Sequence, residues 1–426
     1  MQARSSIVCL AALSCVMAGC AQLLSDWSIG SDAGVRDDGS SSGASAGSPD
    51  GSGSSSGVSA GGSQTSGTTS GGSGSSSGSS SGGSDAVADA GPDAGLDAGC
   101  GSLNTDTNCG ACGYTCVDGR HCSDRRCTPA WLPMTTANAP TARSAPGAAI
   151  AGKLIVAGGS ADCTAIGSLA SGALYDPSAD AWTSLPDLNQ ARADHTLVSS
   201  GTTVYAFGGL SDCANGATPS QLGSLEQWRP GDALWTVVMA SGGPAPRYAH
   251  ESAWTGSGLL VYGGSGGSAP YLNTGSVYDP VLNAWQSADC GFAGCDRDNA
   301  WAIVGQRYVR LWGGNVGSAS GGLQFDTSTL TWTPWTPDAN FPTSLGNPAD
   351  DGRRVYFPSN GATGNLDIVL YDRATLARSV DTATSPANLS PTGSIAWTGS
   401  EVVLWSGATS NGTPTPVGGR YQPPAP

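Results

Sequence analysis

Short runs that alternate between apolar and polar residues begin near residue 128 and continue through the rest of the chain. They are rich in Val, Leu, Tyr and Trp, and clusters of Gly, Pro and Asp separate them. Alternation of this kind places every second side chain on one face of a β-strand, and the clusters between the runs favour tight turns. The pattern therefore predicts an all-β domain over residues 128–426.

One turn between two of these predicted strands recurs along the domain. In its first copy, LYDPSADAWTSLP at residues 174–186, an aromatic residue is followed seven positions later by a tryptophan. Four copies keep this spacing: Tyr175 with Trp182, Trp228 with Trp235, Tyr278 with Trp285, and Phe325 with Trp332. In a fifth copy, Tyr371 is followed by Arg378 at the tryptophan position. We expect these large, recurring side chains to fill the core rather than to bind a ligand.

A pair of glycines ends the apolar run that precedes each turn. The pairs are Gly158-Gly159, Gly208-Gly209, Gly263-Gly264 and Gly313-Gly314, so the repeats step by 50, 55 and 50 residues. A repeat near 50 residues that contains four short strands indicates a β-propeller, in which each repeat forms one blade. The fifth repeat has Phe357-Pro358 in place of the glycines, and the sixth has Ser406-Gly407.

The double glycine followed by an aromatic residue and a tryptophan resembles the kelch motif, which is shared with galactose-oxidase-like propellers. The resemblance covers about residues 128–426 and implies a six-bladed propeller. The sixth repeat reaches Tyr421 and has no tryptophan after it. The segment PAWLP at residues 129–133 offers Trp131 instead, so we expect the N-terminal strand to complete the sixth blade and close the ring.

Residues 1–20 have one basic residue, Arg4, and then an apolar run that is too short to span a bilayer, which is typical of a secretory signal. The last four, Met17 to Cys20, resemble the lipobox of bacterial lipoproteins. This resemblance implies that Cys20 becomes the lipidated N-terminus, and a plain signal peptide cleaved nearby is the alternative. Ala21 stands where an inner-membrane retention signal would have Asp, so we expect attachment to the bacterial outer membrane or cell surface.

Residues 21–99 consist mostly of Gly, Ser, Asp and Ala, with almost no apolar side chains to bury. Such a segment cannot offset the entropy of ordering itself, so we expect a disordered, flexible linker. The net charge is −15 and Lys153 is the only lysine. A nucleic-acid partner is therefore not expected, because it would require a basic face.

Residues 100–127 form a short segment with six cysteines and too few apolar residues to build a core. In an exported chain, an even number of cysteines predicts a small disulfide-rich module with three bridges, for which fifteen pairings are open. Zinc is the alternative, because Cys109 and Cys112 have knuckle spacing and His121 is near. The six cysteines are Cys100, Cys109, Cys112, Cys116, Cys122 and Cys127.

Four further cysteines lie in predicted propeller loops. Cys163 and Cys213 each come four positions after a glycine pair in adjacent repeats, so we expect a disulfide between blades. Cys290 and Cys295 flank the short segment GFAG, and we expect a disulfide between them. Both bridges would stiffen loops.

Arginines recur at the predicted start of the inner strands. Arg192, Arg247 and Arg297 each lie sixteen positions before a glycine pair, and Arg143 is one residue out of register. His195 and His250 follow two of them at equivalent positions. Two interpretations are open: the side chains could line one mouth of the axis and bind an anion, or they could brace the blades through hydrogen bonds to carbonyls.

The chain shows no convincing catalytic motif. Galactose-oxidase-like relatives hold copper with two tyrosines and two histidines, whereas His195 and His250 are repeat-equivalent residues. Glutamates are few, and no nucleophile or zinc-protease motif is present. We therefore expect a monomeric, surface-exposed lipoprotein, without a cofactor or metal, whose propeller binds an extracellular protein or glycan. A copper oxidase or another carbohydrate-active enzyme is the alternative.

Overall fold

The computed structural model describes residues 104–105, 108–109, 116, 122–123, 126–161, 167–211, 219–267, 271–316, 321–342, 347–361, 365–408 and 413–424. The predicted signal sequence, Cys20, the linker over residues 21–99, and Cys100, Cys112, Cys163 and Cys213 lie outside this set. The described residues contain no helix that is long and apolar enough to cross a membrane.

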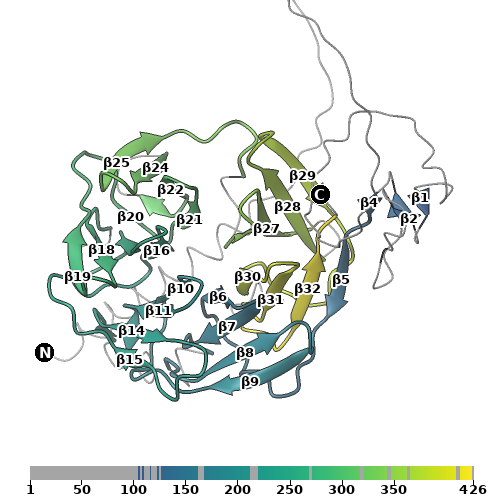
Figure 1. Ribbon diagram of the computed structural model, residues 1–426, viewed down its shortest axis with the longest axis horizontal. Coiled ribbons are helices and arrows are strands. Elements are labelled where there is room, and N and C mark those ends of the chain that lie inside the picture. The colour runs from purple at the N-terminus through teal and green to yellow at the C-terminus, as the bar shows by residue number, and fades with distance from the viewer. Residues whose placement is uncertain are drawn as a thin grey trace, which may run out of the picture. The chain divides into compact units, whose positions relative to one another are not determined.

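The described part of the chain forms six four-stranded antiparallel sheets, which Figure 1 shows arranged as a ring. The first blade is β6 (Gly147–Ile150), β7 (Lys153–Ala157), β8 (Gly172–Asp176) and β9 (Ala181–Leu185). The second is β10 (Thr196–Ser199), β11 (Val204–Phe207), β14 (Leu225–Trp228) and β15 (Thr236–Val237). The third is β16 (Glu251–Trp254), β17 (Leu259–Tyr262), β18 (Gly275–Asp279) and β19 (Ala284–Ser287).

The remaining three blades have the same order from the axis outward. The fourth is β21 (Trp301–Val304), β22 (Tyr308–Trp312), β24 (Gly322–Asp326) and β25 (Thr331–Trp335). The fifth is β26 (Ala349–Asp350), β27 (Arg354–Asn360), β28 (Leu366–Asp372) and β29 (Ala377–Asp381). The sixth is β30 (Ser394–Trp397), β31 (Val402–Trp405), β32 (Gly418–Gln422) and β5 (Ala130–Pro133). Two small ribbons, β12 (Leu210–Ser211) with β13 (Ser220–Gln221) and β20 (Arg297–Asp298) with β23 (Asn315–Val316), extend the loops of the second and fourth blades.

The N-terminal strand β5 closes the ring, as the sequence predicts. It pairs antiparallel with β32, and Trp131 lies directly opposite Tyr421. The same register places Trp182 opposite Tyr175 in the first blade, so Trp131 occupies the missing tryptophan position of the sixth. Pairing of the two ends of the domain covers the strand edge that an open array would expose.

In the first, second and fourth blades, the recurring tryptophan also joins the blade to the segment that enters it from the preceding blade. The Trp182 indole nitrogen donates a hydrogen bond to the Thr135 carbonyl at 3.0 Å, and the Trp332 indole nitrogen donates to the Ala288 carbonyl at 2.8 Å. Trp235 bonds the Pro186 carbonyl in the same way at 3.1 Å. These tryptophans are buried, which explains why one residue type recurs: its ring fills the wedge between blades and its N–H holds the connection.

The fifth blade achieves the same packing with a different residue. Its tryptophan position is Arg378, opposite Tyr371. Phe341, from the segment that enters this blade, is 5% exposed and packs edge-on against Tyr371 with ring centroids 5.0 Å apart. A residue from the connection therefore fills the wedge that a strand residue fills elsewhere.

The glycine pairs are required by the close approach of backbone at the end of each second strand. Gly159 has φ near +87°, and a Cβ there would lie 2.3 Å from the Ser144 carbonyl oxygen. In the fifth blade, where Phe357 and Pro358 replace the pair, β27 instead continues as a strand to Asn360. Phe357 is fully buried and adds its ring to the core around Phe341.

The cysteine-rich segment contains two short ribbons, β1 (Asn104–Thr105) with β2 (Asn108–Cys109) and β3 (Cys122–Ser123) with β4 (Arg126–Cys127). Disulfides join Cys109 to Cys122 and Cys116 to Cys127. These bonds narrow the fifteen pairings that the sequence leaves open. Among the described residues, Cys109, Cys116 and Cys127 form the one group close enough to hold a metal, and all three are in disulfides.

Candidate functional site

The recurring arginines lie inside the blades. Arg143, Arg192, Arg247 and Arg297 are each no more than 2% exposed. Three of them donate to the carbonyl of the first glycine of the pair, at 3.1 Å for Arg143 to Gly158, 2.9 Å for Arg192 to Gly208 and 2.9 Å for Arg247 to Gly263. Each of the four also donates to the carbonyl of the residue just before the third strand, namely Ser171, Ser224, Thr274 and Gly321.

Of the two interpretations left open for Arg143, Arg192, Arg247 and Arg297, this geometry favours the bracing of blades over an anion-binding mouth. Their guanidinium groups tie the glycine turn to the start of the third strand, which is the bracing interpretation. A guanidinium that is enclosed and bonded to backbone carbonyls cannot meet a ligand from solvent. Burial also lowers the pKa of Arg143 and Arg247 to about 10, so both remain charged at neutral pH.

His195 and His250 are packing residues as well, and they do not reach an open mouth. Each is 4% exposed. His195 lies over Gly158 of the preceding blade, where a Cβ would be 2.6 Å from the imidazole Cε1, and His250 lies over Gly208 in the same way. Burial lowers the pKa of both imidazoles, to about 3 for His250, so they are neutral at physiological pH.

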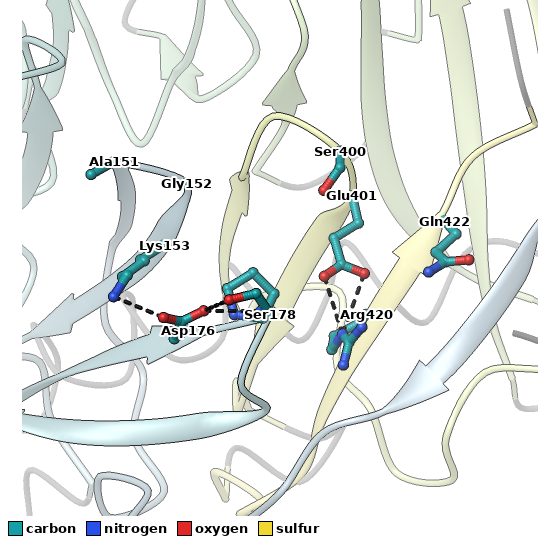
Figure 2. A pocket seen from close by; sticks show the side chains of 10 residues that line it. Ala151, Gly152, Lys153, Asp176, Ser178, Ser400, Glu401, Arg420 and Gln422 are labelled. Atoms are coloured by element: carbon teal, nitrogen blue, oxygen red, sulfur yellow. Dashed lines mark hydrogen bonds and ion pairs between the residues drawn. The ribbon is translucent and has the colours of Figure 1, made fainter. Parts of the chain in front are cut away.

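An open groove of about 560 Å³ lies between the first and sixth blades (Figure 2). Its walls are the β6–β7 and β8–β9 turns on one side and the β30–β31 turn with β32 on the other. Figure 2 shows an ion pair on each side. Lys153 Nζ is 2.8 Å from Asp176 Oδ2, and Arg420 Nε is 3.1 Å from Glu401 Oε1.

The first-blade pair is the accessible one. The Lys153 side chain is 37% exposed and that of Asp176 is 27% exposed, whereas Glu401 and Arg420 are more enclosed. Lys153 and the Ser178 hydroxyl donate hydrogen bonds to Asp176 and hold the pKa of its carboxyl well below the usual range. The groove therefore offers an ammonium and a carboxylate side by side, which suits a ligand that both donates and accepts hydrogen bonds.

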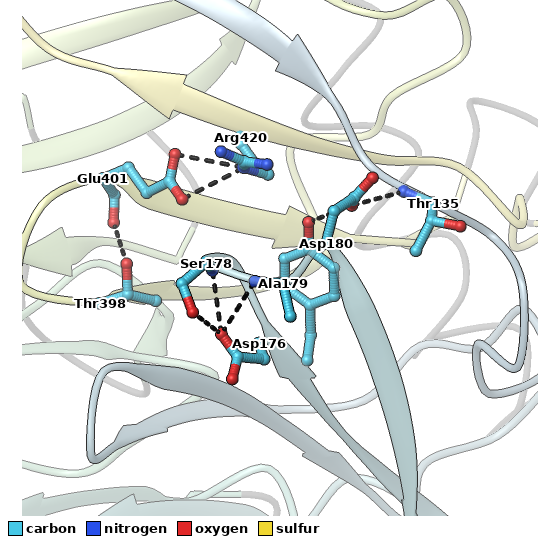
Figure 3. A network of polar contacts seen from close by, with 9 residues as sticks. Thr135, Asp176, Ser178, Ala179, Asp180, Thr398, Glu401 and Arg420 are labelled. Atoms are coloured by element: carbon cyan, nitrogen blue, oxygen red, sulfur yellow. Dashed lines mark hydrogen bonds and ion pairs between the residues drawn. The ribbon is translucent and has the colours of Figure 1, made fainter.

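Hydrogen bonds fix the position of the first-blade wall (Figure 3). Asp180 accepts from the Thr135 backbone N–H at 2.9 Å and from the Tyr175 hydroxyl at 2.6 Å. Thr135 follows the closing strand β5, so ring closure and the groove share this network. On the opposite wall, the Thr398 hydroxyl donates to the Glu401 carbonyl at 2.9 Å.

The groove residues could not be predicted as a site from the sequence. There, Lys153 is distinguished only as the chain's single lysine, and Asp176 only as part of the repeated turn. Arg420 and Glu401 face Lys153 because the ring closes, which brings the two ends of the domain together. The spacing of the repeats cannot predict this contact. It relates equivalent positions in different blades, whereas these residues occupy different positions in the first and sixth blades and become neighbours only when the ring closes.

A second cavity, of about 470 Å³, follows the propeller axis and is lined by the inner strands of all six blades. Most of its lining is small or apolar, and Glu251 of β16 is one of its two acidic residues. Burial raises the pKa of Glu251 to about 8. The other, Asp350, pairs with Arg373.

Of the predicted loop disulfides, the structure describes one. Cys290 and Cys295 are joined, and the Tyr262 hydroxyl donates to the Cys295 carbonyl at 2.8 Å. The bridge thus fixes the loop that leads to Arg297. This is the stiffening role expected from its short span.

Comparison with known proteins supports the repeat assignment. No family model matches the chain. Kelch-like protein 33 of Homo sapiens is 36% identical over 137 residues, which are 32% of this chain and 24% of that protein. Kelch-like protein 36 of Rattus norvegicus is 32% identical over 142 residues, 33% of this chain and 22% of that protein.

A third relative has the printed name of an enzyme. N-(sulfonatooxy)prop-2-enimidothioate sulfolyase of Thlaspi arvense is 27% identical over 195 residues, 37% of this chain and 54% of that protein. The chain thus matches less than a quarter of the length of the two Kelch-like proteins and about half of the sulfolyase. The glycine turns, the aromatic–tryptophan pairs, the six closed blades and the likeness to Kelch-like proteins identify the domain as a kelch-repeat β-propeller.

Proposed function

We propose that the chain is a surface lipoprotein whose propeller is a binding head for an extracellular protein or glycan. The likeness to Kelch-like proteins supports a protein-interaction module. The observation that carries the proposal is the groove between the first and sixth blades. It offers the accessible pair of Lys153 and Asp176 on a fixed wall, whereas the repeated arginines and histidines are used inside the blades.

The attachment is supported by the N-terminal sequence. The lipobox-like residues end at Cys20, and the Gly/Ser-rich linker that follows has the composition of a flexible tether. A lipid at Cys20 would hold the head at the outer membrane or cell surface, and the linker would give it reach.

A glycan and protein array, probed with the full chain, tests the proposal. We expect specific binding that falls at least tenfold in Lys153→Glu, because the substitution reverses the exposed charge of the groove. Arg307→Glu is the matched control, since it makes the same charge change at an exposed site outside the groove. Equal losses in both variants would mean that the groove is not the binding site.

An enzymatic function is the second candidate, and the likeness to the sulfolyase favours it. The copper-oxidase form of this candidate finds no support in the described residues, because His195 and His250 are enclosed between blades. Sulfate release from a sulfonatooxy thioimidate by the purified full chain, abolished by Asp176→Asn, would favour the enzyme over the binding head.

A further inference from the structure

The outer strand of the fifth blade, β29, is largely exposed. Four of the five residues of β29 are exposed and none is buried. In other blades the outer strand contains, or directly follows, a tryptophan that packs against its neighbours, such as Trp182 in β9 and Trp332 in β25. In β29 that position is Arg378, and Figure 1 shows β29 as the outermost strand of its blade.

Arg378 is released from a packing role because Phe341 fills the wedge beside Tyr371. Its guanidinium takes part in none of the ion pairs that the described residues form. The chain has 18 basic and 33 acidic residues. Among the described residues, Arg378 is therefore an exposed arginine without a carboxylate partner in an acidic protein.

The strand edge and its side chains indicate one kind of occupant. β29 ends its sheet, so its outward-facing backbone N–H and C=O groups have no strand beside them in the described structure. An extended segment can add to such an edge through main-chain hydrogen bonds, with side chains giving specificity. Val380, two residues beyond Arg378 in β29, is 50% exposed, and Leu376, in the turn that leads into the strand, is 49% exposed. An exposed basic residue with apolar residues before and after it complements a segment with an acidic residue between two apolar ones.

We propose that β29 is a docking edge for an extended segment of a partner protein in which an acidic residue lies between apolar residues. The segment adds to the fifth blade as a fifth strand, and its carboxylate pairs with Arg378. This inference rests on the proposed binding function and assigns it a surface separate from the groove. A second copy of the chain is a poorer occupant, because antiparallel pairing of two β29 edges would bring their Arg378 side chains near each other.

A display library of random linear 12-residue peptides, selected on the full chain, tests this assignment. We expect the enriched peptides to carry Asp or Glu between β-branched or aromatic residues. Their affinity should fall at least tenfold in Arg378→Glu and stay within twofold of the original in Arg307→Glu. Both substitutions are at exposed sites, and thermal unfolding checks that both variants remain folded.

Hydrogen exchange of the peptide complex locates the contact. Slower amide exchange confined to residues 376–381 supports strand addition at β29. Protection at the groove turns instead would overturn this inference and leave the proposed binding function intact, and a library without enriched peptides would also overturn it. Sedimentation of the chain without peptide tests whether a second copy binds at β29. A dimer that dissociates in Arg378→Glu would assign the edge to a second copy and overturn this inference.

Discussion

Arg192 and Glu226 form an ion pair that the second blade encloses almost completely, with side chains 0% and 1% exposed. Glu226 also accepts hydrogen bonds from the Asn189 backbone N–H and side-chain amide. Arg192→Met would leave a buried carboxylate without its cation, so we expect the free energy of unfolding to fall by about 3–5 kcal/mol. Urea denaturation measures the loss.

A second substitution separates charge from packing at this position. Adding Glu226→Gln to Arg192→Met should restore part of the stability, on the order of 1–2 kcal/mol, because the stranded charge is gone. Arg247→Met is the matched control, since Arg247 bonds only neutral acceptors and has no carboxylate to strand. A double variant that is no more stable than Arg192→Met would show that the ion pair is not the source of the loss.

Glu251 gives the propeller a pH dependence with a definite sign. Its pKa is about 8 in the folded state, raised by burial from an ordinary value of 4.5. Between these values the folded state holds the proton that the unfolded state releases, so this residue lowers stability as pH rises from about 4.5 to 8. We expect Glu251→Gln to be more stable than the wild type at pH 9, by about 1–3 kcal/mol after allowance for its partial exposure. The difference should vanish at pH 4, and unfolding midpoints at both values check this.

At the scale of elements, Trp131 belongs to β5, the strand on which closure of the ring depends. It lies opposite Tyr421 in the pair of strands that closes the ring, with ring centroids 5.4 Å apart. Because the side chain is partly buried, we expect Trp131→Ala to lower the free energy of unfolding by about 2–4 kcal/mol. Deleting residues 128–134 should cost more than deleting everything before 128. Equal unfolding midpoints for the two deletions would contradict the closure.

How far the sequence predicts these elements depends on which contacts repeat. The repeat period predicts the blades and the core role of the tryptophans, because equivalent residues in a ring meet equivalent neighbours, and the kelch resemblance with the PAWLP segment predicts six blades and the closing strand. Phe341 could not be predicted, since it lies in a connection with no counterpart in the motif. The arginines were ambiguous for another reason: their spacing fixes the strand position, and only the packed structure shows that the guanidinium turns inward to carbonyls.

At the scale of the whole molecule, the proposed attachment of the head to the cell depends on one residue, Cys20. Under this proposal, Cys20→Ser removes the acceptor of the lipid and the cleavage that precedes its attachment. We expect the variant to lose incorporated palmitate and to leave the membrane fraction. Cys15→Ser is the control, because it replaces another cysteine of the same apolar segment.

Folding and ligand binding of the head give this experiment a second readout, because both should be independent of lipid attachment. The two are separated by about 80 residues of Gly/Ser-rich sequence that has no capacity to form a core. Released Cys20→Ser protein should therefore keep the thermal unfolding midpoint and array binding of the anchored form. Palmitate that stays on Cys20→Ser would refute lipidation at this residue, and a lowered midpoint would mean that the head depends on its anchor for more than location.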